Sequence, residues 1–220
     1  MKGRLITAKM IAGFKEHLIL EERSAATIQK YIRDVKAFAE YARLCQAAQR
    51  RHNERLNLIL QAICGTGIRV SELQFITVEA AKCGEAVVRC KGKTRTVFLV
   101  KALRQKLLRY AAKQNIQSGM IFVTRTGKPI SRTNIWREMK ALCVEADVNP
   151  QKVFPHNLRH LFARVFYGIE KDIANLADIL GHSSINTTRI YNLHRHGTPP
   201  PDGNYAPDPM KKAAHSAAGT

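Results

Sequence analysis

The helical spacing of apolar residues constrains the fold of this chain more than any other feature. Near the start, Met10, Phe14 and Leu18 fall on one helical face. A second helical pattern follows Ser24, a residue type that caps helices, and continues to Tyr41. Two helices of this size cannot bury a stable core by themselves. We therefore expect a helical hairpin that packs against a larger body.

Two segments alternate between apolar and polar residues as strands do. Residues 84–90 (GEAVVRC) and 95–100 (RTVFLV) predict an antiparallel hairpin across KGKT, with Gly92 at the turn. A short strand is expected at 120–123 (MIFV). Helices are expected near residues 54–64, 101–115, 131–146, 155–167 and 171–180. The predicted fold class is mainly α with a small antiparallel β-sheet (α+β).

Composition divides the chain into four parts. The helical pair occupies residues 1–43, and the basic run AAQRRHNERL indicates a linker at 44–53. Residues 54–193 form the main domain. Residues 194–220 contain five of the eight prolines, which predicts a disordered tail.

The net charge points to an anionic partner. Thirty-six Lys and Arg residues against 17 Asp and Glu residues give +19, an excess that opposes compaction unless a polyanion is bound. No basic amphipathic anchor stands out, and no apolar run approaches the ~18 residues of a membrane span. The first residues lack the pattern of a secretory signal. We expect a cytoplasmic protein that binds nucleic acid and no membrane.

The segment FPHNLRHLFARVFYG contains the first candidate site. Pro155 suits the first turn of a helix and Gly168 suits its end. At helical spacing, His156, Arg159 and His160 share a face, which favours an anionic ligand. The alternative is a helix with one buried, hydrogen-bonded histidine and a solvated arginine.

A zinc site is a weaker interpretation of the same residues. His156 and His160, with His182 further along, have usable spacing, but the pair encloses Asn, Leu and Arg rather than the Glu of a metalloprotease helix. An adjacent arginine also repels a cation. The five cysteines are scattered without a CxxC pair, which predicts reduced thiols rather than a zinc site or a disulfide framework.

Two further basic motifs are TGIRVSEL and RCKGKTRT. Arg69 follows a glycine-punctuated break, where its side chain can turn inward and Glu72 can supply the carboxylate that a buried guanidinium requires. The alternative is an ordinary surface arginine. Lys91, Lys93 and Arg95 are expected at the hairpin tip, either as solvated charges or as contacts to a DNA groove.

The last motif, LGHSSINTTRIY, contains His182 and Tyr191. Taken alone, it describes a helix cap followed by a packed tyrosine. Taken with TGIRVSEL, KGKTR and HNLRH, in this order, it resembles the tyrosine recombinase (phage integrase) family. The resemblance covers about residues 7–192. It implies a tyrosine recombinase catalytic-domain fold, preceded by a truncated helical core-binding domain that contacts DNA.

The resemblance implies a site-specific recombinase or integrase that breaks and rejoins DNA without metal or ATP. Tyr191 attacks a phosphodiester, forming a 3′-phosphotyrosyl link and releasing a 5′-hydroxyl. A phenol has a pKa of about 10 and needs help with its proton, which His156 is expected to accept. Arg69 and Arg159 are expected to hold the non-bridging oxygens, because a guanidinium matches phosphate bidentately.

The remaining roles follow the same motifs. Lys91 is expected to protonate the leaving oxygen, with Lys93 as a competitor for that role. His182 is expected to hydrogen-bond the phosphate, and His160 to orient its neighbours. Lys93, Arg95 and His160 are also assigned to DNA contact.

The chain departs from the family pattern at both ends. The helical pair is about half of a usual core-binding domain, and the residues after Tyr191 lack the apolar periodicity of a docking helix. The family acts as a tetramer on double-stranded DNA, and a monomer with impaired synapsis is the alternative here. Three rival functions are a truncated, non-catalytic DNA-binding protein, a relaxing topoisomerase and a metal-dependent nuclease, the last disfavoured by the lack of carboxylate clusters.

Overall fold

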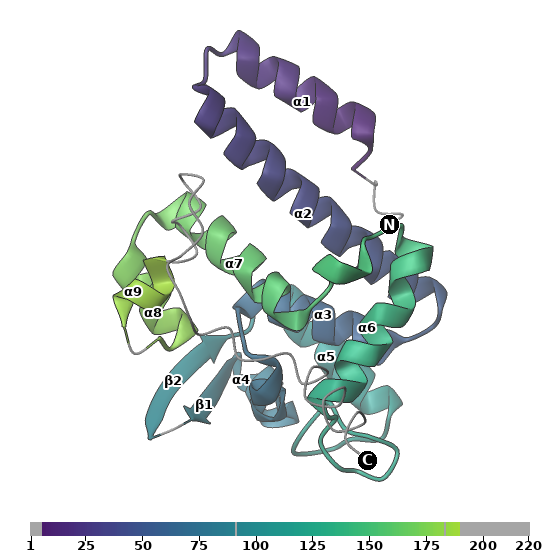
Figure 1. Ribbon diagram of the computed structural model, residues 1–220. Helices are drawn as coiled ribbons and strands as arrows, with labels where there is room; N and C mark the ends of the chain where they lie inside the picture. Colours follow the sequence, from purple (N-terminus) through teal and green to yellow (C-terminus); the bar gives the residue numbers. More distant parts are fainter. Residues whose placement is uncertain (1–5, 91, 183, 190–220) are drawn as a thin grey trace, which may run out of the picture.

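The computed structural model describes residues 6–90, 92–182 and 184–189. Within these ranges the protein is mostly helical and contains a two-stranded antiparallel sheet (Figure 1). This confirms the predicted fold class. Lys91, Tyr191 and the predicted tail at 194–220 lie outside the described residues. None of the described helices is long and apolar enough to cross a membrane.

The predicted helices and the hairpin appear in the predicted order, whereas α4, α9 and two 3₁₀ helices were not predicted. The two strands are β1 (Glu85–Cys90) and β2 (Lys93–Phe98). The 3₁₀ helices are η1 (Val70–Phe75) and η2 (Pro150–Lys152). The α-helices are α1 (Ala8–Leu20), α2 (Ala25–Arg50), α3 (Glu54–Thr66), α4 (Val78–Cys83), α5 (Lys101–Lys113), α6 (Arg132–Ala146), α7 (Pro155–Glu170), α8 (Ile173–Leu180) and α9 (Ile185–Arg189).

Helix α3 is the centre of the core. It begins where the Asn53 side chain accepts a hydrogen bond from the Leu56 amide at 3.0 Å, and almost all of its apolar residues are fully buried. It packs against α2, α5 and α7. It ends at Gly67, whose φ of 66° suits glycine. A Cβ at Gly67 would lie 2.5 Å from the Phe162 ring of α7, so this position needs glycine for two reasons.

The first two helices form an arm that extends from the core (Figure 1). Helix α1 packs along α2, but Leu18 is its only buried residue in the described structure. Much of the predicted apolar face is open to solvent, because Met10 is 53% exposed and Phe14 is 36% exposed. The arm is therefore held to the body mainly through α2.

The predicted linker at 44–53 is wrong. Helix α2 continues to Arg50 because Leu44 and Ala47 are buried in the core. Arg50 also forms an ion pair with Glu145 of α6 at 2.7 Å. The basic residues of this segment thus face outward from a helix that enters the body without a break.

Two local predictions also differ from the structure. The expected strand at 120–123 is reduced to isolated bridges, Thr77 with Met120 and Val123 with Pro129. Helix α7 begins at Pro155 as predicted but passes through Gly168 and ends at Glu170. Lys171 caps it with a left-handed φ of 57°. A glycine inside a helical pattern does not end the helix when the pattern continues beyond it.

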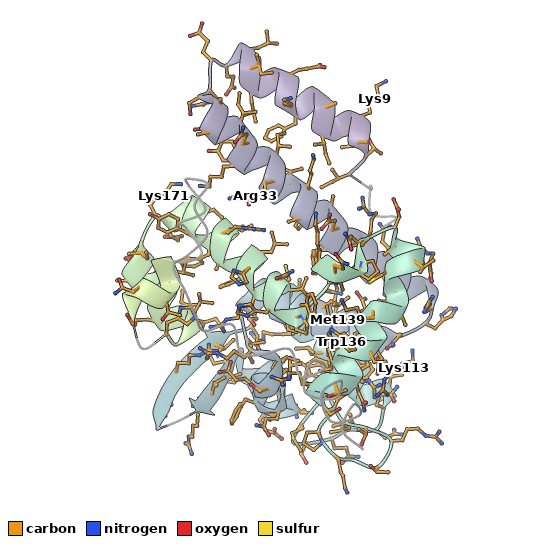
Figure 2. All side chains as sticks on the ribbon, in the orientation of Figure 1. Lys9, Arg33, Lys113, Trp136, Met139 and Lys171 are labelled. Atoms are coloured by element: carbon orange, nitrogen blue, oxygen red, sulfur yellow. The ribbon has the colours of Figure 1, made fainter. Side chains whose placement is uncertain are left out.

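Exposed lysines are spread over the whole molecule. Lys9 on the arm, Lys113 at the end of α5 and Lys171 after α7 lie far apart on the surface (Figure 2). The positive charge is therefore not confined to one helix. Three arginines, Arg69, Arg95 and Arg159, by contrast converge at one interior point.

Candidate active site

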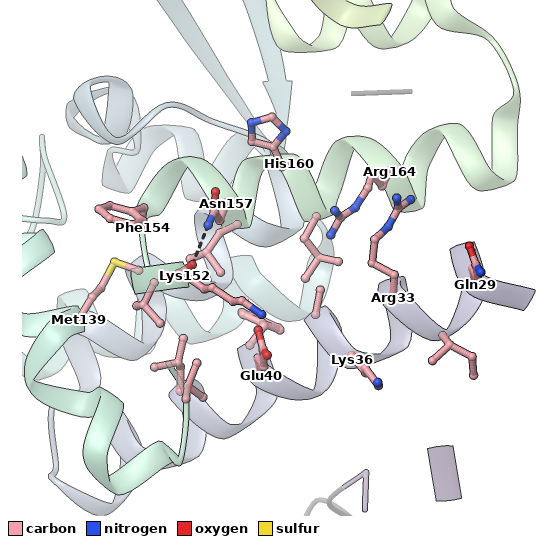
Figure 3. A pocket seen from close by; sticks show the side chains of 18 of the residues that line it. Gln29, Arg33, Lys36, Glu40, Met139, Lys152, Phe154, Asn157, His160 and Arg164 are labelled. Atoms are coloured by element: carbon pink, nitrogen blue, oxygen red, sulfur yellow. Dashed lines mark hydrogen bonds between the residues drawn. The ribbon is translucent and has the colours of Figure 1, made fainter. Parts of the chain in front are cut away.

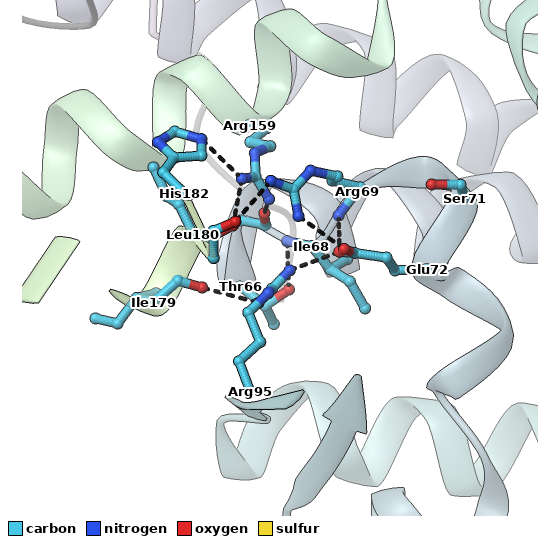
Figure 4. Close-up of polar contacts among 12 residues, drawn as sticks. Thr66, Ile68, Arg69, Ser71, Glu72, Arg95, Arg159, Ile179, Leu180 and His182 are labelled. Atoms are coloured by element: carbon cyan, nitrogen blue, oxygen red, sulfur yellow. Dashed lines mark hydrogen bonds and ion pairs between the residues drawn. The ribbon is translucent and has the colours of Figure 1, made fainter. Parts of the chain in front are cut away.

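Four segments that are distant in sequence meet at the end of α8. They bring Arg69, Arg95, Arg159 and His182 together (Figure 4). The arginines bind consecutive carbonyl oxygens: Arg95 to Ile179 at 2.8 Å, Arg159 to Leu180 at 2.6 Å and Arg69 to Gly181 at 3.1 Å. The last carbonyls of a helix lack intrahelical partners and carry partial negative charge. The end of α8 therefore orders the three guanidinium groups.

Helix α8 is itself fixed at both ends. Asp172 caps its start by accepting hydrogen bonds from the Ala174 and Asn175 amides at 2.9 and 3.0 Å. Leu176 and Leu180 pack in a small apolar cluster against α7. The carbonyls that the arginines bind are thus held by a rigid element.

Glu72 is the carboxylate at the centre of this cluster. It is only 2% exposed and accepts from the Arg69 amide at 2.9 Å and from the Arg69 guanidinium at 2.8 Å. Arg95 adds a third contact at 2.5 Å. Burial alone would raise the pKa of Glu72, but the hydrogen bonds from Arg69 and the charge of Arg95 hold it below its ordinary value. The partner predicted for Arg69 is present.

Arg95 does not lie where the sequence prediction placed it. It pairs with Val88, two positions from the Cys90–Lys93 pair at the hairpin end. Alternate side chains of a strand face opposite sides, and Arg95 faces inward to Glu72 with its side chain 11% exposed. Its position corrects the expectation of a solvated charge at the hairpin tip. DNA contact by Lys93 and Arg95 stays a prediction.

Arg159 is buried in the same cluster. It is 3% exposed and donates to the Gly67 and Leu180 carbonyls. Its Nη2 also lies 3.2 Å from Nε2 of His182. The alternative of a solvated arginine is therefore wrong, and Arg159 joins the end of α3 to the end of α8.

His156 and His160 lie on one face of α7, as their spacing predicted. Their rings pack edge to face with centroids 4.2 Å apart. Burial lowers the pKa of His156, and the charges of Arg159 and Arg69 lower it further. At neutral pH the His156 ring is therefore neutral and able to accept a proton.

His182 follows the end of α8 and is also kept neutral. Burial, then the charges of Arg159, Arg69 and Arg95 together with His156, lower its pKa to about 4. Its Nδ1 lies 2.8 Å from the hydroxyl of Thr188, which is 0% exposed. Sequence reasoning missed Thr188, because one threonine of the pair in INTTR carries no sign of being buried.

The charges at the site favour an anion. The three guanidinium groups lie around a single carboxylate, Glu72, which pairs with Arg69 and Arg95 but not with Arg159. The cluster therefore keeps an excess of positive charge in a poorly solvated position. Arg69 is the most open of the three, with its side chain 36% exposed. Across the described residues, no group of three His, Cys, Asp or Glu side chains is placed to hold a metal ion.

A basic groove runs between α2 and α7 beside the site (Figure 3). Its volume is about 760 Å³, and it is lined by the cations Arg33, Lys36, Lys152 and Arg164 and by His160. Asp34 lies 3.1 Å from the Arg164 guanidinium. Since the His160 ring packs on His156, the groove and the arginine cluster adjoin.

Two predicted site residues cannot be placed. Lys91 and Tyr191 lie outside the described residues. Lys93 opens β2, where it pairs with Cys90. The structure thus brings together Arg69, His156, Arg159, His160 and His182 from the predicted set, with Arg95 beneath them.

Comparison with known proteins agrees with this arrangement. The model of the phage integrase family matches residues 36–197. Over 82% of its length, the chain is 31% identical to the tyrosine recombinase XerH of Campylobacter jejuni, of which it covers 50%. It is 30% identical to the tyrosine recombinase XerC of Erythrobacter litoralis, covering 75% of this chain and 56% of XerC.

Solved structures show the same fold. The crystal structure of XerA recombinase superposes with a TM-score of 0.61 at 23% identity, covering 100% of this chain and 86% of XerA. The pre-cleavage complex of XerH with its difH substrate gives a TM-score of 0.60 at 20% identity, covering 80% and 50%. The chain spans about half the length of the curated relatives it matches. Its sequence match, fold and ordered motifs show that this chain belongs to the phage integrase family.

Proposed function

We propose that this chain is a site-specific recombinase that cleaves and rejoins DNA strands through a 3′-phosphotyrosyl intermediate on Tyr191. The observation that carries the proposal is the convergence of Arg69, Arg159, His156 and His182 at one positively charged site. The partner is double-stranded DNA, as the XerH complex with its difH substrate suggests by analogy.

The arginine cluster supports the electrostatic part of the reaction. Negative charge builds on the non-bridging oxygens as the phosphorus becomes five-coordinate, and fixed donors stabilise it. Arg69 is open enough to contact the phosphate directly. Arg159 is deeper and contributes mainly through its charge and through His182.

The proton transfers follow from the neutral histidine. His156 accepts the phenol proton as the Tyr191 oxygen bonds to phosphorus and the bond from phosphorus to the 5′-oxygen breaks. Lys91 protonates the departing 5′-oxygen, with Lys93 as the competitor. The phosphotyrosyl ester preserves the phosphodiester bond energy, so religation requires neither ATP nor metal. His156 returns its proton in the reverse step.

The groove between α2 and α7 supports DNA binding next to the site. Its exposed cations Lys36 and Lys152 suit backbone phosphates, which carry no sequence information. A non-catalytic DNA-binding protein of the same family is the second candidate, because the groove supports DNA binding independently of strand cleavage.

A covalent-adduct assay tests the proposal. The protein is incubated with a pool of nicked suicide duplexes of randomised sequence, in EDTA, and denaturant-stable protein–DNA adducts are recovered and sequenced. We expect adducts from the wild type and none from Tyr191→Phe. Tyr31→Phe, an exposed tyrosine on α2, is the matched control and should keep the wild-type yield.

Other outcomes identify the rivals. DNA binding without an adduct indicates the non-catalytic protein. Cutting that EDTA abolishes, without an adduct, indicates a nuclease. Relaxation of supercoils without strand exchange indicates a topoisomerase. Each of these results would reject the recombinase.

A further inference from the structure

The hydrogen bonds of His182 define its tautomer. Nη2 of Arg159 lies 3.2 Å from Nε2, and a guanidinium can only donate. Nε2 therefore accepts, and the proton of the neutral ring is on Nδ1. Nδ1 in turn donates to Oγ1 of Thr188 at 2.8 Å.

This tautomer cannot perform the role expected of His182 on DNA. A phosphate oxygen is an acceptor, so Nε2 must carry a proton to bind it. Adding a second proton to the ring is disfavoured by burial and by the charges of Arg159, Arg69 and Arg95. The remaining route is the other neutral tautomer, in which Nδ1 loses its proton to water and Nε2 gains one. The net charge does not change.

The hydroxyl of Thr188 fits both states. A threonine hydroxyl has one donor and two acceptor positions and rotates to suit its partner. We propose that Thr188 is a positioning residue that holds His182 in both neutral tautomers, accepting from Nδ1 in the free protein and donating to Nδ1 when Nε2 binds a phosphate. The second half rests on the proposed function, and the first half does not.

The location of Thr188 gives this contact a wider consequence. Thr188 belongs to α9 and precedes Tyr191 by three residues in the sequence. The orientation of His182, and through it the contact to Arg159, depends on α9 being packed in place. Helix α9, which precedes Tyr191 in the sequence, is thereby coupled to the arginine cluster.

Nitrogen-15 NMR of the imidazoles tests the first half without DNA. His182→Asn identifies the His182 signals. We expect the wild type to show a hydrogen-bonded Nδ1 proton protected from exchange, and Thr188→Val to lose that protection. Thr188→Ser should restore it. Thr187→Val is the matched control, because Thr187 is exposed on the same helix. A wild-type proton on Nε2, or an unchanged Thr188→Val spectrum, would overturn the assignment.

The adduct assay tests the second half. Thr188→Val should slow adduct formation about threefold to tenfold at saturating DNA, the worth of one hydrogen bond, with DNA affinity unchanged. Thr188→Ser should restore the rate. In a His182→Asn background, Thr188→Val should have no further effect, and an equal slowing there would overturn the proposal. If the wild type forms no adduct while the NMR result holds, the recombinase proposal and the DNA-bound half fail together, and the free-state contact stands.

Discussion

At the scale of single residues, the site depends on a shortage of negative charge. Glu72 serves both Arg69 and Arg95, and the other donors of the arginines bind backbone carbonyls instead. Carbonyl dipoles order a guanidinium without neutralising it. The cluster therefore stays positive and ready for an anion.

Glu72→Gln should lower the free energy of unfolding and reduce the dependence of that free energy on pH. Breaking a buried ion pair costs about 3 kcal/mol, the lower end of the usual range because Arg69 is partly exposed. The pKa of Glu72 is lowered in the folded state, so its contribution is present above the unfolded value of about 4.3 and is lost as pH falls through the folded value. Urea unfolding between pH 7 and pH 3 measures this.

The control for that experiment is Glu170→Gln, at an exposed carboxylate on the last turn of α7. It should leave both the stability and its pH dependence unchanged. If the free energy of unfolding depended on pH in the same way for the wild type and Glu72→Gln, the proposed charge state of Glu72 would be contradicted.

At the scale of elements, the end of α8 determines the site. Gly181 ends the helix with a φ of 63°, and a Cβ there would lie 2.6 Å from Cδ of Arg95. The helix end and the arginine are therefore fitted to each other. Glycine is required both for the backbone conformation and for the close approach of Arg95.

Gly181→Ala should lower the free energy of unfolding by about 1–2 kcal/mol, the cost of a left-handed conformation, and should displace Arg95. Gly168→Ala is the matched control, because Gly168 has open space and a helical position. It should be neutral or stabilise by about 0.5–1 kcal/mol. Chemical denaturation measures the free energy of unfolding of both variants. Similar losses of stability in the two variants would contradict the role of Gly181.

Helix α1 of the arm makes few buried contacts with the rest of the protein. Only Leu18 of α1 is buried, whereas α3 is enclosed on several sides. Amides in α1 should therefore exchange with solvent well before those of α3, because local opening exposes little additional apolar surface. Hydrogen–deuterium exchange with mass spectrometry measures this order. Equal protection of α1 and α3 would show that another surface covers the arm.

At the scale of the whole molecule, the charge of +19 determines how strongly the protein is attracted to a polyanion such as the proposed DNA partner. Its distribution over the arm and body promotes non-specific attraction. The groove between α2 and α7 adds a local concentration of cations. Affinity for any duplex should consequently fall steeply with salt.

The double variant Lys36→Gln and Lys152→Gln should reduce the steepness of that salt dependence. Each lost phosphate contact lowers the slope of log K against log salt by about 0.9, so the pair should remove about 1.8. Lys113→Gln, at an exposed lysine remote from the groove, should leave the slope nearly unchanged. Titrations of a duplex by fluorescence anisotropy provide the slopes. An unchanged slope in the double variant would show that Lys36 and Lys152 do not contact DNA phosphates.

The sequence by itself determined the local structure. Periodicity located the longer helices and the hairpin but not the short helices α4 and α9. The predicted cap at Ser24 accepts its hydrogen bond from the Thr27 amide. The pairing of Arg69 with Glu72 could also be predicted from the sequence, because the two residues lie three positions apart. These features depend on contacts within one turn, which residue spacing encodes directly.

The tertiary structure decided everything that joins distant segments. It turned Arg95 inward to Glu72 and buried Arg159 against the Gly67 carbonyl. It also explains why α2 continues through the expected linker, because the apolar residues there are buried in the core. Such contacts depend on which surfaces pack together over long separations, and residue spacing carries no record of that choice.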